Sequence, residues 1–156
     1  MSSESVKSGL IAGFVATCVL SFFMLVKASM GLLPQLNPIR DIVTVADNLT
    51  GADFPLPLGW LGHFFLGTVA WGLAYAWLEG QLPGSPIVKG LAFGFGAWLA
   101  MMVLFMPMAG EGFFSLKDGP PAAVASLVLH LIYGAVLGMV YGRLRSATLA
   151  GHIRPR

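Results

Sequence analysis

Residues 120–142 read PPAAVASLVLHLIYGAVLGMVYG, and this stretch contains no Asp, Glu, Lys or Arg. A membrane-spanning helix needs about 20 mostly apolar residues, because each residue rises about 1.5 Å across a hydrocarbon core about 30 Å thick. The two leading prolines suit the first turn of a helix, where a missing N–H leaves no hydrogen bond unmade. The stretch therefore predicts a transmembrane helix over residues 122–142, which ends before Arg143.

Three other stretches have the same apolar character: residues 8–26, 58–78 and 90–108. The composition of the whole chain agrees, with 56% hydrophobic and 10% charged residues. A soluble domain has about 25% charged residues, so this chain has too few polar side chains to cover a water-facing surface. We expect an all-α polytopic membrane protein, a single domain over residues 1–156 with four transmembrane helices and the lipid bilayer as its surroundings.

The charged residues that flank the spans predict the orientation. Four spans place both termini on one side, together with the loop between the second and third spans. The basic residues on that side are Lys7, Lys89, Arg143, Arg145, Arg154 and Arg156, and those on the other side are Lys27, Arg40 and Lys117. Cytoplasmic segments carry the excess of Lys and Arg, so six against three predicts that both termini are cytoplasmic. The first apolar stretch is longer than a usual signal-peptide core, and we expect it to be retained.

The loop between the first two spans is expected to contain a short amphipathic helix. Asn37 offers an N-cap, Pro38 suits the first helical position, and Gly51 offers a C-terminal stop. Apolar residues recur between them at helical spacing, namely Ile39, Ile42, Val43, Ala46 and Leu49, while Arg40, Asp41, Asp47 and Asn48 take the other positions. Two arrangements remain open: a helix lying on the outer face of the membrane, or a lid packed on the helical bundle.

The two halves of the sequence resemble each other, which predicts an internal duplication over approximately residues 6–80 and 88–145. The pair Gly9 and Gly13 recurs as Gly90 and Gly94. In the second and fourth spans the matching sets are His63, Gly67, Gly72 and Tyr75 against His130, Gly134, Gly138 and Tyr141. Membrane proteins are often built from such repeats, here related by a pseudo-two-fold axis along the membrane normal. Small residues let helices pack closely in lipid, either within the bundle or against a partner.

His63 and His130 are the candidate site residues, because ionisable groups inside spans often mark functional sites. They follow Phe54 and Pro121 at the same distance, so helices that begin there would place both imidazoles at similar depth. Two facing imidazoles can bind haem b, share a metal or relay protons. The glycine one turn after each His makes room for a flat macrocycle or for a neighbouring helix.

A simpler interpretation is that each histidine only forms a hydrogen bond between helices. The hydroxyls available for such bonds are those of Thr17, Ser21 and Ser126. No metal site is expected, because methionines such as Met106 and Met108 more often fill gaps in cores than bind Cu(I). No cofactor other than haem b is indicated.

Enzyme motifs are missing from the sequence. It has no G-x-S-x-G, P-loop or H-E-x-x-H pattern and no paired carboxylates within a span, so we expect a non-enzymatic protein without catalytic residues. Spans without Asp or Glu also argue against a typical cation-coupled transporter. The net charge of +2 is too small to suggest nucleic-acid binding.

Several motifs resemble a family of small four-helix bacterial inner-membrane proteins of unknown function, and more distantly the YagU-like inner-membrane proteins. The motifs are Gly9-Leu10-Ile11-Ala12-Gly13, Trp60…His63…Gly67, Met106-Pro107-Met108-Ala109-Gly110 and Leu129-His130-Leu131-Ile132-Tyr133-Gly134. The resemblance implies a bacterial inner (plasma) membrane and a four-helix architecture. It implies no activity and therefore no catalytic residues.

Three functions follow from these features. The first is an accessory or assembly subunit of a membrane complex, with other membrane subunits or a second copy as partners and a flat, Gly-rich docking side. The second is a haem or other cofactor carrier in which His63 and His130 face each other. The third is a small transporter or channel, whose lining would come from Thr17, Ser21, His63, Ser126 and His130.

Overall fold

A computed structural model describes residues 1–153 of the chain, with side chains described through residue 148. Within these residues the ordered elements are all helical. Four segments are long and apolar enough to cross a membrane: Ser3–Ser29, Leu56–Gln81, Pro86–Ala109 and Pro120–Thr148. The expected all-α class with four membrane-spanning helices is confirmed. The first three helices extend a few residues beyond their predicted spans, because backbone hydrogen bonding continues past the apolar stretch. The prediction that the fourth helix ends before Arg143 is wrong, since α7 continues to Ile153 for the same reason. Arg154 and Arg156, which the charge count includes, lie outside the described residues.

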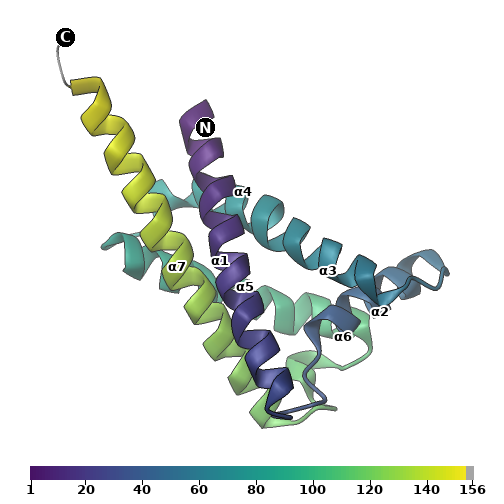
Figure 1. Ribbon diagram of the computed structural model, residues 1–156. Coiled ribbons are helices and arrows are strands. Elements are labelled where there is room, and N and C mark those ends of the chain that lie inside the picture. Colours follow the sequence, from purple (N-terminus) through teal and green to yellow (C-terminus); the bar gives the residue numbers. More distant parts are fainter. Residues whose placement is uncertain (154–156) are drawn as a thin grey trace.

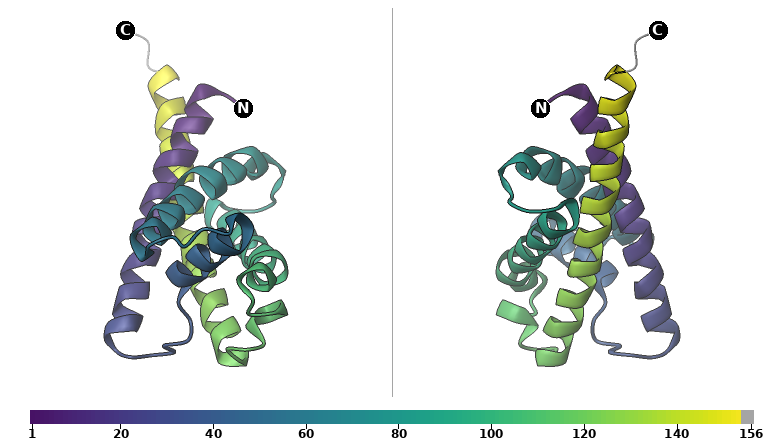
Figure 2. Two further views of the ribbon diagram at one scale, coloured as in Figure 1. Left: turned by 90° about the vertical axis from the view of Figure 1, so that its right-hand side faces the viewer. Right: turned by 90° about the vertical axis from the view of Figure 1, so that its left-hand side faces the viewer.

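Two long helices, α1 (Ser3–Ser29) and α7 (Pro120–Ile153), pack against each other, and the beginning of α1 and the end of α7 lie at the same end of the molecule (Figures 1 and 2). The second span packs on α1 and the third packs on α7. The bounds are α1 Ser3–Ser29, α3 Leu56–Phe65, η1 Leu66–Ala70, α4 Trp71–Leu78, η2 Glu79–Gln81, α5 Pro86–Ala100, η3 Met101–Phe105, α6 Met106–Ala109, η4 Phe113–Ser115 and α7 Pro120–Ile153. We call the end opposite the termini the far end.

Glycines set the closest helix contacts. A Cβ placed on Gly9 would lie 2.6 Å from the carbonyl oxygen of Gly72, and one on Gly90 would collide with the carbonyl oxygen of Gly134. The predicted small-residue stripes are thus used inside the bundle, where helices in lipid gain most from close packing. These contacts make Gly134 the counterpart of Gly72, about one turn away from the sequence match with Gly67. The duplication itself stays a prediction.

A π-helical turn interrupts the second span at η1, Leu66–Ala70. A π turn adds one residue to a helix and often lies at a functional site. The extra residue explains why Gly67 and Gly72 both reach α1 although they are five positions apart: a Cβ on Gly13 would lie 2.8 Å from the carbonyl oxygen of Gly67 and 3.1 Å from the Cα of Gly72. A second π turn, η3, interrupts the third span.

The loop helix α2 (Pro38–Thr50) forms as predicted and packs on the bundle near the far end. The Oδ1 atom of Asn37 accepts a hydrogen bond from the backbone N–H of Arg40 at 3.2 Å, and Gly51 ends the helix with a φ of 72°. A Cβ on Gly59 of α3 would touch α2, and the amide of Asn48 donates to the carbonyl of Met108 at 2.9 Å. This packing matches the lid arrangement.

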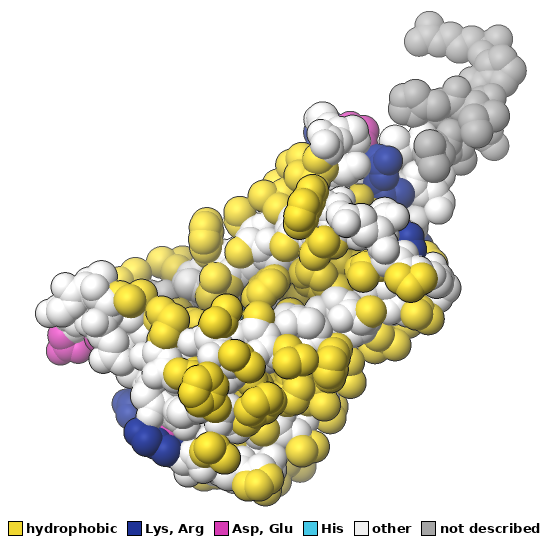
Figure 3. All heavy atoms as spheres, turned by 180° about the vertical axis from the view of Figure 1, so that it is seen from behind, with side chains coloured by type: hydrophobic (Ala, Val, Ile, Leu, Met, Phe, Trp, Pro, Cys, Tyr) yellow, Lys and Arg dark blue, Asp and Glu magenta, His cyan; other side chains and the backbone are white. Residues whose placement is uncertain are grey.

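Apolar side chains dominate the outer surface between the two ends of the molecule. Figure 3 shows hydrophobic side chains spread over the face seen from behind, with the Lys and Arg side chains gathered toward its ends. Toward the termini, the interior is filled by rings: Tyr75 contacts Phe93 and Tyr141, with centroids 5.2 Å and 5.3 Å apart. The interior near the far end is less completely filled.

Candidate functional site

A cavity of about 290 Å³ lies inside the half of the bundle nearer the far end. Pockets for small molecules range from about 300 to 1,000 Å³ and combine apolar walls with a few polar groups. Most of the lining is apolar and comes from α1, the second span, the third span, α7 and the segment that includes α2. The polar lining residues are Thr17, Asp41, His63, Ser126, His130 and Tyr133.

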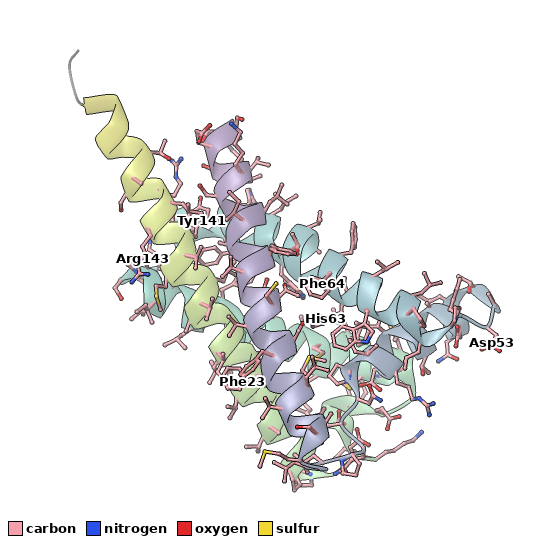
Figure 4. All side chains as sticks on the ribbon, in the orientation of Figure 1. Phe23, Asp53, His63, Phe64, Tyr141 and Arg143 are labelled. Atoms are coloured by element: carbon pink, nitrogen blue, oxygen red, sulfur yellow. The ribbon has the colours of Figure 1, made fainter. Side chains whose placement is uncertain are left out.

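His63 lies between α3, which carries it, and α1, and it is 8% exposed (Figure 4). Its Nε2 atom is 3.0 Å from the hydroxyl oxygen of Ser21 on α1. The rings of Trp60 and Phe64 meet the imidazole edge-to-face, with centroids 5.8 Å and 5.7 Å away. Of the interhelical hydrogen bonds that the simpler interpretation assigned to both histidines, the one at His63 is present, and it fixes the ring beside the cavity. His130 instead bonds a backbone carbonyl of its own helix.

His130 lines the same cavity from α7. Its Nδ1 atom is 2.8 Å from the backbone carbonyl oxygen of Ser126, which can only accept, so Nδ1 donates. A neutral ring then keeps Nε2 as an acceptor, the arrangement also common in imidazoles that bind ligands or metals. Because α3 begins at Leu56 and α7 at Pro120, His130 lies almost one turn further into its helix than His63.

The space beside the two glycines that were expected to make room for a macrocycle is filled by neighbouring helices. A Cβ on Gly67 would collide with the side chain of Thr17, and one on Gly134 would collide with the carbonyl oxygen of Gly90. Together with a volume of about 290 Å³, this packing suits a ligand smaller than haem. Within the described residues, no cluster of three or more His, Cys, Asp or Glu side chains is arranged to hold a metal ion.

Asp41 is the site residue that the sequence analysis missed. The helical pattern assigned it to the polar face of the loop helix, but the structure buries it at 8% exposure against the cavity. Burial first, and then the charges of Asp118 and Glu111, together raise the pKa of this carboxyl to about 7. Val45 lies four residues later on the same helical face and is also buried. An apolar residue at that spacing was the signal in the sequence that the face of Asp41 points inward.

The cavity does not continue as a polar path toward the termini. Of the five residues expected to line a channel, Thr17, His63, Ser126 and His130 line the cavity, while Ser21 bonds His63. The next layer of the interior contains buried apolar side chains and the contacting rings of Tyr75, Phe93 and Tyr141. Among the described residues, the arrangement can therefore hold a molecule, and the layer next to the cavity is built of apolar and aromatic side chains.

Comparison with known proteins identifies a family and no function. The chain belongs to the family described as "Family of unknown function (DUF6789)", whose model matches residues 3–150. No curated protein and no solved structure matches the chain. The chain is thus a membrane protein of a family whose activity is not established.

Proposed function

We propose that this protein is a non-enzymatic, membrane-embedded binding protein for a small, mostly apolar molecule. The observation that carries the proposal is that His63 and His130, which belong to different helices, line one cavity. The apolar walls would hold the body of the molecule, and the two imidazoles would orient its polar group. The free acceptor on His130 is the atom best prepared for that contact.

The size of the cavity argues for a ligand smaller than haem b, and its closed inner side favours binding over conduction. An accessory or assembly role is a second proposal, supported by the compact bundle. The glycine stripes do not add support, because they pack the protein's own helices together. Gly96 is not used in this internal packing, since a Cβ there would meet nothing within 4 Å.

We also propose a bacterial plasma membrane with both termini in the cytoplasm. Among the described residues, Lys7, Lys89, Arg143 and Arg145 support this orientation, because basic residues gather on the cytoplasmic side. A C-terminal fluorescent protein should fold and fluoresce in cells, whereas a C-terminal alkaline phosphatase should stay inactive. The opposite pattern would reverse the orientation.

The binding proposal can be tested by filling the cavity. Ala100 lines the cavity on α5, and Ala92 on the same helix is exposed. Purified wild type, Ala100→Phe and Ala92→Phe would each be extracted with organic solvent and analysed by mass spectrometry. We expect a small molecule to co-purify with wild type and Ala92→Phe in stoichiometric amount and to be depleted at least tenfold in Ala100→Phe. Equal amounts in all three would show that the molecule binds elsewhere.

An absorption spectrum of the same samples, oxidised and dithionite-reduced, separates haem from other ligands. The proposal expects no haem bands. A reducible haem spectrum that disappears in both His63→Ala and His130→Ala would instead make the protein a haem carrier, with the bundle opening to admit the macrocycle.

A further inference from the structure

We infer that the cavity binds lipophilic ammonium ions, that is, molecules with one positively charged nitrogen on an apolar body. The inference rests on the proposed function, because it names the class of ligand for the same cavity. Its basis is the buried carboxylate of Asp41 on α2.

Asp41 is the only formally charged side chain among the residues that line the cavity, and no Lys or Arg lies in the lining. Within the described residues its carboxylate takes part in no hydrogen bond and no ion pair. A buried carboxylate is strongly unfavourable unless a cation or hydrogen-bond donors compensate it. A cationic ligand would supply the missing partner.

The nearby basic side chains are not in a position to replace such a ligand. The ammonium of Lys27 donates to the carbonyl oxygens of Leu33 and Leu36, at 2.9 Å and 2.6 Å. Arg40 and Lys117 are exposed. Negative charge is added instead: after burial, the charges of Asp118 and Glu111 are the further causes that raise the pKa of the Asp41 carboxyl. The charges of these two carboxylates favour a cation over an anion beside Asp41.

The rest of the lining fits an ammonium ion with an apolar body. Trp71, Phe105 and Tyr133 line the cavity, and aromatic faces attract ammonium groups. Leucine side chains, including Leu20 and Leu129, complete the apolar wall. A carboxylic acid or a phosphate would instead meet a like charge at Asp41, which disfavours anionic ligands.

The test uses two probes of the same shape. Benzyltrimethylammonium carries a permanent positive charge, and neopentylbenzene is its neutral carbon isostere. Their affinities for the purified full-length protein would be measured by calorimetry or by the shift in unfolding temperature, at pH 8. We expect the cation to bind at least tenfold more tightly than the isostere, which corresponds to about 1.4 kcal/mol.

The variants distinguish the contribution of the Asp41 charge to binding from the contribution of the space in the cavity. Asp41→Asn should abolish the preference for the cation, and Asp53→Asn, which changes an exposed carboxyl after α2, should keep it. Ala100→Phe should weaken both probes. Equal or tighter binding of the neutral probe to wild type would overturn the ammonium inference while supporting the binding cavity. Failure of both probes would also overturn it, and the proposed function would still be decided by the molecule that co-purifies.

Discussion

The hydroxyl of Tyr133 donates a hydrogen bond of 2.6 Å to the carbonyl oxygen of Gly67. The bond joins α7 to the π-helical turn of the second span, across 66 positions of sequence. Both residues line the cavity, so the bond fixes the distance between two of its walls. It also fixes the turn that directly follows the helix bearing His63.

Removing this hydroxyl should weaken the bundle. Tyr133→Phe should lower the free energy of unfolding by about 0.6 kcal/mol, and by at most about 1.7 kcal/mol, the range for interhelical hydrogen bonds in membranes. Tyr75→Phe is the matched control, because the Tyr75 hydroxyl is buried and has no hydrogen-bond partner within the described residues. Denaturant titration in mixed micelles would measure both. A larger loss for Tyr75→Phe than for Tyr133→Phe would contradict the assigned bond.

Replacing a glycine by alanine should destabilise the protein where the glycine packs against another helix and not where it faces open space. Gly90→Ala should destabilise the bundle by about 1–3 kcal/mol, because the new Cβ would collide with the backbone of Gly134 and force the helices apart. Gly96→Ala, on the same helix, should be neutral or slightly stabilising, since its Cβ would enter open space and alanine favours a helix. The same denaturant titration ranks the two variants, and equal losses would show that α5 does not pack on α7 through Gly90.

The buried carboxyl of Asp41 should make stability depend on pH. Its pKa is about 7 in the folded protein, raised from an ordinary value of 3.8, so the folded state binds its proton more tightly than the unfolded state. The resulting stabilisation is complete below about pH 4 and is lost as the pH rises through about 7, with a slope of at most about 1.4 kcal/mol per pH unit.

Asp41→Asn should remove this contribution, and Asp53→Asn should retain the wild-type slope. Unfolding free energies between pH 4.5 and 8 would be measured in about half-unit steps, with no ligand added. A wild-type protein that becomes more stable from pH 5 to pH 7, with Asp41→Asn showing the same rise, would refute the assignment.

Lys27 should hold the segment between α1 and α2 in place. Its ammonium binds the carbonyl oxygens of Leu33 and Leu36, and Leu33 has a φ of 45°, which few non-glycine residues adopt. Lys27→Met should raise hydrogen exchange at the backbone amide of Leu36, which donates to Leu33. Lys7→Met changes an exposed lysine paired with Glu4 and should leave that exchange rate unchanged. Unaltered exchange at Leu36 in Lys27→Met would show that the segment keeps its conformation without the hydrogen bonds from Lys27.

Much of the fold could be predicted because it depends on features that are local in the chain. A run of about 20 apolar residues forms a spanning helix wherever it lies, since the bilayer leaves its backbone no other partner. The limits of α2 followed from Asn37, Pro38 and Gly51 for the same reason: a cap, a fixed φ and a left-handed stop are properties of single positions. The two histidines were found because ionisable side chains in apolar helices are rare.

The tertiary structure alone decided which of these side chains meet. Asp41 and His63 line one cavity only because α2 packs on α3 with one face inward, and that packing places Asp41 against the cavity although the sequence pattern set it apart from the apolar residues. The pairing of Tyr133 with Gly67 depends on a π turn, whose extra residue is set by packing against α1. The sequence by itself determined which four segments are apolar enough to span a membrane and where α2 begins and ends, because composition and capping act within a few residues. It did not determine the end of α7, which continues past Arg143 to Ile153. The cavity, its charge and its size came from contacts between residues far apart in the chain, whose geometry no local pattern specifies.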